Sequence, residues 1–586
     1  AHAKGVDGLC REFLRFLPTD ILNLVSHLVS VCLYTAQYMK EFRDMRGMAV
    51  HKKQSWSEVK NYRPILISSV VTALTEKIFG NQAISHYEVR DFLHPHMGGF
   101  RTFHSIGGTV NDMRRDGLRE PVDTIECLVL TDLSNAFGSS DDLLLVEKLK
   151  GRWGQRPLTF LRSYLSQSSI VVTAHGTDGV QFKTSPTGTG AQGSTSAPSI
   201  FLILMSDAHA GQYGDTSYSF ADDNNQLTCN KDQSVVKSEA QNALTEFCDF
   251  TVDNNIKLNA TKTFYCISSR SRNVTVDSEA FTLTANGTRI EEKKEINMLG
   301  IRMCNKLSFA PHYAHLVTTL KVKCALVRKN LYQSSKIFVK ILVRSFLHGS
   351  LSHAVQYVQK PPIAICRSLN GQINNTLRKK FCSREERENE KLGVFVPQRE
   401  ILKRACLPSY ENILRILKLC RLNKILMQGQ PAFEFEMILS HIGTVFSVRE
   451  RDRLVLPPLT YRQSRSERYP ADYYTTQPHE WIALYNKLPL SIRSKLGSQS
   501  FSFEVRKLYS DVCQHSESSS YICHNCNEDS RIYDKELTDQ VANRLVGKFR
   551  GQPEQTFFKK VTRQPGRDCY TRHLDQQLSW FTNTGY

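Results

Sequence analysis

Three short apolar segments in the first half of the chain each adjoin a polar cluster, and this pattern restricts the fold more than any other feature. Residues 127–131 lead into Asp132, residues 217–221 lead into Asp222, and residues 263–267 follow a lysine. Such runs are typical of short buried strands, and acidic residues at strand ends can converge at one edge of a sheet. The sequence therefore predicts a sheet with a candidate site at its edge.

The length of the chain predicts several packed subdomains, because 586 residues exceed the size at which one hydrophobic core stops growing. Up to about residue 300, strand-like runs mix with helical periodicity, whereas from 311 to about 382 the pattern is mainly helical. We therefore expect an α+β unit followed by a mainly helical region. The chain begins with Ala1 rather than Met, which suggests a processed product or part of a longer polypeptide.

The charge of the chain points to a polyanionic partner. A formal net charge of +19 favours nucleic acid over a small neutral substrate, although charge alone fits an acidic membrane surface equally well. No segment is apolar enough to span a membrane. The 16 cysteines are scattered, which suits a reducing, intracellular location. We expect the nucleus or the cytoplasm, with the mitochondrion as an alternative.

The acidic residues at the strand ends suit phosphoryl chemistry. Transfer of a nucleotidyl group needs carboxylates that hold two magnesium ions, one of which activates the attacking hydroxyl. Asp132 lies in "TDLSNAF", and Asp222 and Asp223 lie in "FADD", between two strand-like runs as in a tight hairpin. Each motif alone is more typical of ordinary turn chemistry.

Two of these motifs, which contain the aspartates, belong to a series of seven that occur in a characteristic order. The motifs are "NYRPILISS" (61–69), "GGFRTFHS" (98–105), "TDLSNAF" (131–137), "GAQGSTSAPSIF" (190–201), "FADD" (220–223), "LNATKT" (258–263) and "INMLGI" (296–301). Together they resemble the polymerase of non-LTR (LINE-type) retrotransposons, a family of reverse transcriptases. The resemblance is strong to about residue 305 and weaker to about residue 510.

The resemblance implies an α+β right-hand polymerase. Residues 1–305 would form the fingers and palm, 306–382 a helical thumb, 383–510 a helical or linker region, and 511–586 a Cys/His-containing segment. The implied enzyme is an RNA-directed DNA polymerase that extends a DNA primer on an RNA template, using deoxynucleoside triphosphates and two Mg²⁺ ions. A ribonucleoprotein assembly is a further implied partner.

The resemblance also assigns roles to the catalytic centre. Asp132 and Asp222 would be the principal magnesium ligands, with Asp223 supporting them. Lys262 would protonate the leaving pyrophosphate. Phe137 stands five positions after Asp132, where an aromatic residue blocks the 2′-hydroxyl of an incoming ribonucleotide. Without the motifs, we would interpret these residues as solvated acids, a loop lysine and a core aromatic residue.

Further residues match the substrate-binding motifs. Gln192 and Gly193 match the pair that lines the nascent base pair, although composition alone would indicate a flexible Gly-rich loop. Arg63, with Lys52 or Lys53, suits a triphosphate, and the alternative for each is an exposed basic residue. One departure is Met97, which stands where the family usually has a glutamine, so template contacts are expected to differ.

The last part of the chain contains a candidate zinc site. Cys513, His515, Cys523 and Cys526 are four ligands that could form a tetrahedral zinc knuckle able to bind nucleic acid. Their intervals match no strict zinc signature, so unliganded thiols are the alternative.

Two other functions compete with the polymerase. One is an organellar maturase-like reverse transcriptase of intron origin. The other is a domesticated reverse-transcriptase fold that acts as an RNA-binding or structural subunit of a ribonucleoprotein. The complete set of three aspartates opposes the second alternative.

Overall fold

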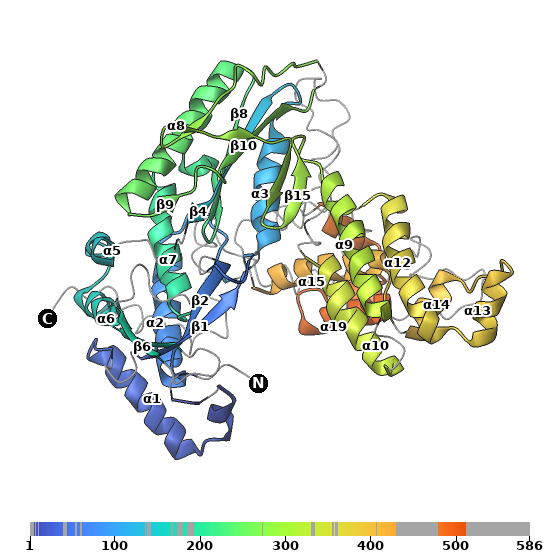
Figure 1. Cartoon of the computed structure of the whole chain (residues 1–586), viewed down its shortest axis with the longest axis horizontal. Helices are drawn as coiled ribbons and strands as arrows, with labels where there is room; N and C mark the ends of the chain where they lie inside the picture. The colour runs from blue at the N-terminus through green and yellow to red at the C-terminus, as the bar shows by residue number, and fades with distance from the viewer. Residues whose placement is uncertain are drawn as a thin grey trace.

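The computed structural model describes two stretches of the chain, 5–428 and 479–510. Within the first stretch it leaves out residues 6, 10, 39–43, 53–54, 59–60, 103, 135, 137–141, 166–167, 173–179, 185–192, 272, 330–333, 354–356, 358–360 and 406. The expected mixture of helix and sheet is confirmed, since sheets occupy the first part of the described chain and helices the second (Figure 1).

A five-stranded sheet carries the apolar segments that the sequence singled out. Its order is β13-β10-β3-β8-β7, and every neighbouring pair is antiparallel except β10 and β13. The strands are β3 (Ile125–Thr131), β7 (Ser217–Phe220), β8 (Asp223–Asn230), β10 (Phe264–Ser269) and β13 (Glu291–Glu292). Each of the three predicted strands is therefore present.

Both faces of this sheet are covered, which explains why β3 is buried at all of its positions. Side chains alternate between the faces of a strand. Cys127 and Val129 point into a core shared with α8 (Gln233–Asp253), whereas Leu128 and Leu130 point into a core shared with α3 (Ile106–Arg119). A nearly continuous apolar run is the pattern expected of a strand packed on both sides.

Small two-stranded pieces surround the main sheet. They are β4 (Leu133–Ser134) with β9 (Lys257–Leu258), β11 (Thr284–Ala285) with β12 (Thr288–Arg289), and β14 (Glu295–Met298) with β15 (Ile301–Cys304). The first of these pairs extends β3 beyond Asp132 and so fixes the backbone on both sides of that residue.

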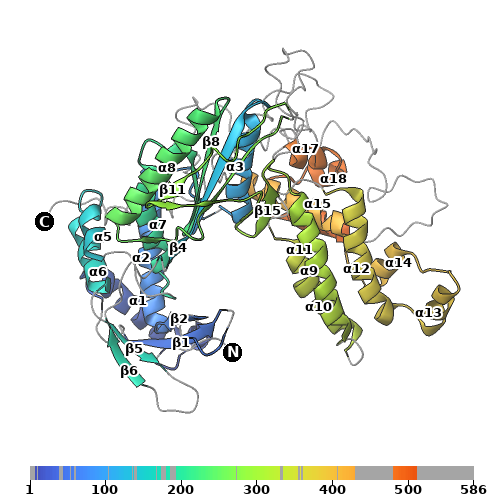
Figure 2. The same ribbon diagram turned by 45° about the horizontal axis from the view of Figure 1, so that its top comes forward.

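A second sheet lies at the N-terminal side of the molecule (Figure 2). Its order is β2-β1-β5-β6, formed by β1 (Met45–His51), β2 (Tyr62–Ile67), β5 (Ser168–Val172) and β6 (Val180–Thr184). The helical elements of this region are η1 (Arg11–Phe16), α1 (Thr19–Tyr34), α2 (Val70–Val89), α5 (Asp142–Leu149), α6 (Gln155–Leu165), α7 (Ala197–Met205), η4 (Ser206–His209) and η5 (Gly214–Thr216). α2 begins where the Ser69 side chain accepts a hydrogen bond from the Thr72 amide.

All described elements after β15 are helical. They are α9 (Ala310–Lys329), α10 (Lys336–Leu342), η6 (Val343–His348), α11 (Gly349–Leu351), α12 (Ile363–Phe381), α13 (Arg384–Lys391), α14 (Gln398–Ala405), α15 (Tyr410–Gln428), α17 (His479–Asn486), α18 (Leu490–Arg493) and α19 (Gln499–Ser510). In both views they gather beyond β15, on the side away from α5 and α6. Among the described helices, none is long and apolar enough to cross a membrane.

Candidate active site

The Asp222–Asp223 pair stands on a two-residue hairpin turn. Phe220 at the end of β7 pairs with Asp223 at the start of β8, so Ala221 and Asp222 form the turn. Ala221 has φ of 59°, a left-handed backbone conformation that a residue with a Cβ rarely adopts. Such strain persists only where the surroundings enforce it, and it is common at functional sites.

Two glycines pack against this turn. The Gly98 amide donates to the Ser219 carbonyl oxygen at 2.8 Å, which lays residues 98 and 99 along the end of β7. A Cβ on Gly99 would collide with the backbone nitrogen of Ala221. The neighbouring Met97 is fully buried, so it packs in the core rather than facing a template. The absence of side chains at Gly98 and Gly99 therefore allows this segment to pack directly against the hairpin turn.

Asp132 reaches the same edge from β3. Thr131 pairs with Asn224, and continuing this antiparallel register by one step places Asp132 beside Asp223. The Asp132 carbonyl oxygen accepts a hydrogen bond from the Asn259 amide at 2.8 Å. Backbone contacts on both strands thus fix where the carboxylate emerges.

Lys262 is brought to this edge by the turn between β9 and β10. Its amide donates to the Asn259 carbonyl oxygen at 3.0 Å, and its Nζ lies 3.3 Å from Asp132 Oδ2. The lysine side chain is exposed and the Asp132 side chain is half-buried. The ammonium group is therefore available to a bound substrate while it contacts the first carboxylate.

The three carboxylates repel one another. Partial burial, followed by the charges of Asp222 and Asp132, raises the pKa of Asp223 to about 6. Burial is also the main cause that raises the pKa of Asp222; the nearby Asp132 raises it further, whereas Arg63 lowers it. Burial and the neighbouring carboxylates thus both disfavour the charged forms of Asp222 and Asp223.

A divalent cation would suit this donor set, because carboxylate oxygens are the ligands that hard cations prefer. Within the part of the chain that the structure describes, no three His, Cys, Asp or Glu side chains are already arranged around one metal position. The carboxylates are therefore neighbours that would have to turn toward a common ion.

Residues 50–303 match the family described as reverse transcriptase (RNA-dependent DNA polymerase). They form a reverse transcriptase domain. All three aspartates and Lys262 lie inside it.

Two curated relatives come from Drosophila melanogaster. The RNA-directed DNA polymerase from mobile element jockey is 23% identical over 336 residues, which are 55% of this chain and 36% of that protein. The probable RNA-directed DNA polymerase from transposon BS is 23% identical over 323 residues, 53% of this chain and 35% of that protein. The chain thus matches about a third of the length of each relative. The resemblance to non-LTR retrotransposon polymerases is confirmed.

Solved structures give a much weaker likeness. Telomerase from Candida tropicalis, in complex with a TWJ fragment of telomeric RNA, has a TM-score of 0.34 and 13% sequence identity, covering 71% of this chain and 67% of that one. A TM-score of this size supports no conclusion about this chain.

Three predicted substrate residues lie in the described part of the chain. Arg63 is exposed on β2 and acts electrostatically on Asp222. Lys52 follows β1, and its amide donates to the Asn61 carbonyl oxygen at 2.7 Å. Gly193 has φ of 115°, and a Cβ there would collide with the Leu66 carbonyl oxygen on β2. The β1–β2 hairpin therefore connects the expected triphosphate residues to the loop of Gly193.

The other predicted residues lie outside the described part of the chain. They are Lys53, Phe137, Gln192 and the zinc candidates Cys513, His515, Cys523 and Cys526. Their expected roles stay predictions.

Sequence reasoning missed two features of the domain. The first is the packing of Gly98 and Gly99 against the hairpin turn, although both glycines lie in the motif at residues 98–105. The second is Glu76, a fully buried residue of α2. Its signal was a carboxylate within the otherwise largely apolar segment 70–79.

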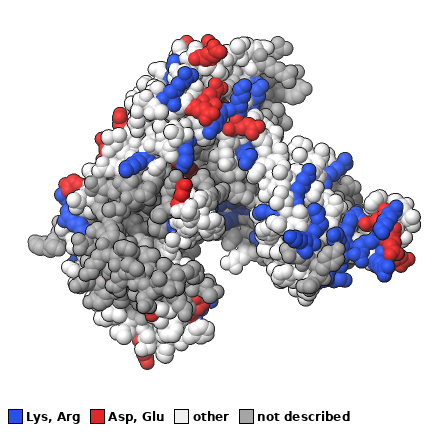
Figure 3. Space-filling model, viewed as in Figure 1, with Lys and Arg blue, Asp and Glu red and all other residues white. Residues whose placement is uncertain are grey.

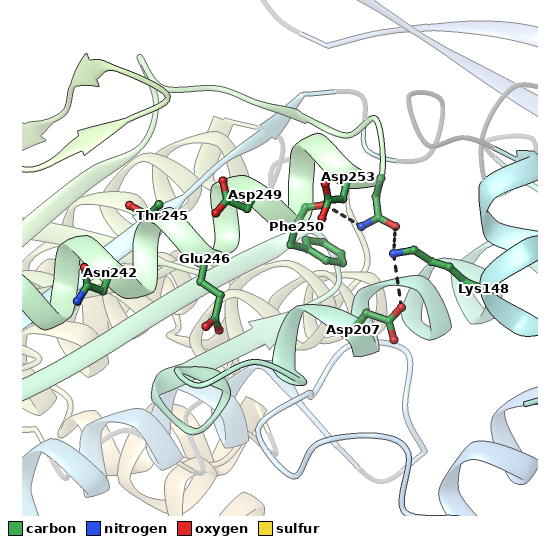
Figure 4. A pocket seen from close by; sticks show the side chains of 9 residues that line it. Lys148, Asp207, Asn242, Thr245, Glu246, Asp249, Phe250 and Asp253 are labelled. Atoms are coloured by element: carbon green, nitrogen blue, oxygen red, sulfur yellow. Dashed lines mark hydrogen bonds and ion pairs between the residues drawn. The ribbon is translucent and has the colours of Figure 1, made fainter. Parts of the chain in front are cut away.

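A pocket of about 500 Å³ lies elsewhere on the domain, beside α8 (Figure 4). Lys148 crosses it, with Nζ 2.7 Å from Asn254 Oδ1 and 3.6 Å from Asp207 Oδ2. Glu246 accepts hydrogen bonds from the amides of Gln212 and Tyr213. None of the predicted site residues lines this pocket, so it is not part of the candidate active site.

Proposed function

We propose that this chain is an RNA-directed DNA polymerase of the non-LTR retrotransposon type, which extends a DNA primer on an RNA template. The observation that carries the proposal is the meeting of Asp132, Asp222 and Asp223 at one sheet edge within a reverse transcriptase domain. The burial of these carboxylates and their mutual repulsion both favour a bound divalent cation.

Reverse transcriptases generally use divalent metal ions. We propose two Mg²⁺ ions here, held by Asp132 and Asp222 with support from Asp223. When bound, the ions would activate the primer hydroxyl and neutralise charge on the phosphoryl oxygens. The hairpin turn at Ala221 holds the backbone of Asp222 and Asp223 in place, so that only their side chains would turn toward the ions.

The remaining side chains would act on the nucleotide. Arg63 and Lys52 are exposed and would bind the triphosphate, the guanidinium through paired hydrogen bonds and the ammonium as a point charge. Lys262 would donate a proton to the pyrophosphate as it leaves. Gly193 would border the nascent base pair with its backbone, which the close contact with Leu66 of β2 holds in place.

The helices after β15 would hold the template–primer duplex. Lysines and arginines gather over this part of the surface (Figure 3). Exposed members are Lys321, Lys329, Lys336, Arg344, Arg367 and Lys379. Basic side chains bind backbone phosphates without reading sequence, which suits a polymerase. We accordingly propose fingers and palm over 1–305, a thumb over 306–382 and accessory regions beyond.

Primer extension tests the proposal. The wild-type chain, a poly-rA/oligo-dT duplex, Mg²⁺ and dTTP are compared with the double variant Asp222→Asn/Asp223→Asn. Asp249→Asn, which changes an exposed carboxylate on α8, is the matched control. We expect extension by the wild type and the control and none by the double variant. A folded wild type that binds the duplex without extending it would refute the proposal and favour a structural role in a ribonucleoprotein.

A further inference from the structure

The carboxylate of Glu76 is fully buried in α2. Tyr38 Oη donates to Glu76 Oε1 at 2.9 Å, and the Ser194 hydroxyl and the Thr195 amide donate to Oε2 at 2.8 and 2.7 Å. A buried carboxylate is costly unless donors of this kind surround it. Both carboxylate oxygens of Glu76 therefore accept hydrogen bonds, and Oε2 accepts those from the two residues that follow Gly193.

The same loop is held from a second side. The hydroxyls of Ser194 and Tyr164 lie 2.6 Å apart, and Tyr164 belongs to α6. On its other side Gly193 abuts Leu66 of β2. Residues 193–196 are thus fixed between the β1–β2 hairpin and the core, immediately before α7 begins at Ala197.

Helices α2 and α7 pack closely together beside the Glu76 carboxylate. Gly80 lies one turn after Glu76 on the same face of α2, and a Cβ there would be 3.0 Å from Ser199 Oγ. The carboxylate lies just before the N-terminus of α7, where a negative charge is favourable. Burial raises the pKa of Glu76, whereas the hydrogen bonds from Ser194 and Thr195 lower it.

We propose that Glu76 is a positioning residue for nucleotide binding, because its carboxylate fixes the loop that presents the backbone of Gly193 to the nascent base pair. The inference rests on the proposed polymerase function and extends it to a residue that touches no substrate. Its effect passes through the Thr195 amide and the Ser194 hydroxyl to the neighbouring glycine.

The deciding variant is Glu76→Met, which keeps the length of the side chain but removes both acceptor oxygens. We expect the KM for dTTP to rise about tenfold, the effect of losing roughly one charge-assisted hydrogen bond, while kcat changes by less than about threefold. Glu76→Gln should restore most of the affinity, because its amide oxygen can still accept from Thr195 and Ser194.

Tyr38→Phe is the matched control, because it removes a donor from the same carboxylate on the side away from the loop. It should lower the melting temperature yet leave the KM for dTTP within about twofold of the wild type. A comparable rise in KM for Tyr38→Phe would mean that core stability alone is responsible, and would overturn the proposal. Should Glu76→Met not fold, Ser194→Ala removes one bond from the loop side and is expected to raise the KM about threefold.

Hydrogen–deuterium exchange gives a readout that needs no polymerisation. Peptides covering residues 193–205 should exchange faster in Glu76→Met than in the wild type, and at the wild-type rate in Tyr38→Phe. Unchanged exchange in Glu76→Met, with an active wild type, refutes this inference alone. A wild type that extends no primer refutes the proposed function first, and the nucleotide-binding part of the inference with it.

Discussion

Replacing Asp223 with Asn should stabilise the metal-free protein while removing its activity. The pKa of Asp223 is raised from 3.8 to about 6 by burial and by two neighbouring carboxylates. This difference corresponds to about 3 kcal/mol, which we halve to about 1.5 kcal/mol because the group is partly open to solvent. The neutral amide avoids this cost and keeps the shape of the side chain.

The sign of the pH dependence follows from the raised pKa. The folded protein binds the proton of Asp223 more tightly than the unfolded chain does, so this group costs nothing below about pH 4 and its full amount above about pH 6. The stabilising effect of Asp223→Asn should therefore be largest near about pH 8 and shrink as the pH falls toward 4.

Thermal melting with a chelator, at several pH values, measures this effect. Asp249→Asn is again the control and should leave the melting temperature unchanged. Excess Mg²⁺ should stabilise the wild type more than Asp223→Asn, since an ion that binds only the folded state adds to stability. A variant that melts at or below the wild-type temperature near pH 8, without metal, would refute the cost of the charged Asp223 side chain in the metal-free site.

Three further predictions concern single residues. Gly193→Ala forces a Cβ against Leu66 at φ of 115°, so primer extension should fall at least about tenfold while circular dichroism shows a folded protein. Arg270→Met strips Glu126 of a buried partner 2.8 Å away and should lower the unfolding free energy in urea by about 3 kcal/mol; a loss below about 1 kcal/mol would contradict this. Lys262→Gln should reduce kcat for dTTP about a hundredfold with little change in KM, and an unchanged kcat would exclude proton donation by this lysine.

The sheet could be predicted because its strands are buried on both faces. The segments that became β3, β7 and β10 are short, apolar and bounded by polar residues, and their order placed Asp132 and Asp222 at one edge. These features depend on local composition and on the alternation of side chains, both of which a sequence displays directly.

Long-range backbone contacts could not be predicted in this way. Nothing in the sequence near Ala221 indicates its positive φ, or that Gly99, more than a hundred positions earlier, packs against it. Glu76 reads as an ordinary helical glutamate until the fold brings Tyr38 and Thr195 to its two oxygens. Such contacts depend on the tertiary arrangement, to which a single sequence gives no direct access.

The core beneath β3 has a consequence for making shorter versions of the protein. Leu128 and Leu130 of the sheet share one buried cluster with Leu316 and Leu320 of α9 and with Leu369 of α12. A fragment that stops at residue 305 would therefore carry an uncovered apolar surface, and we expect it to aggregate during expression. Fragments meant for the study of the sheet alone should keep the chain into α15, because the same buried cluster also includes Ile401, Tyr410 and Leu414.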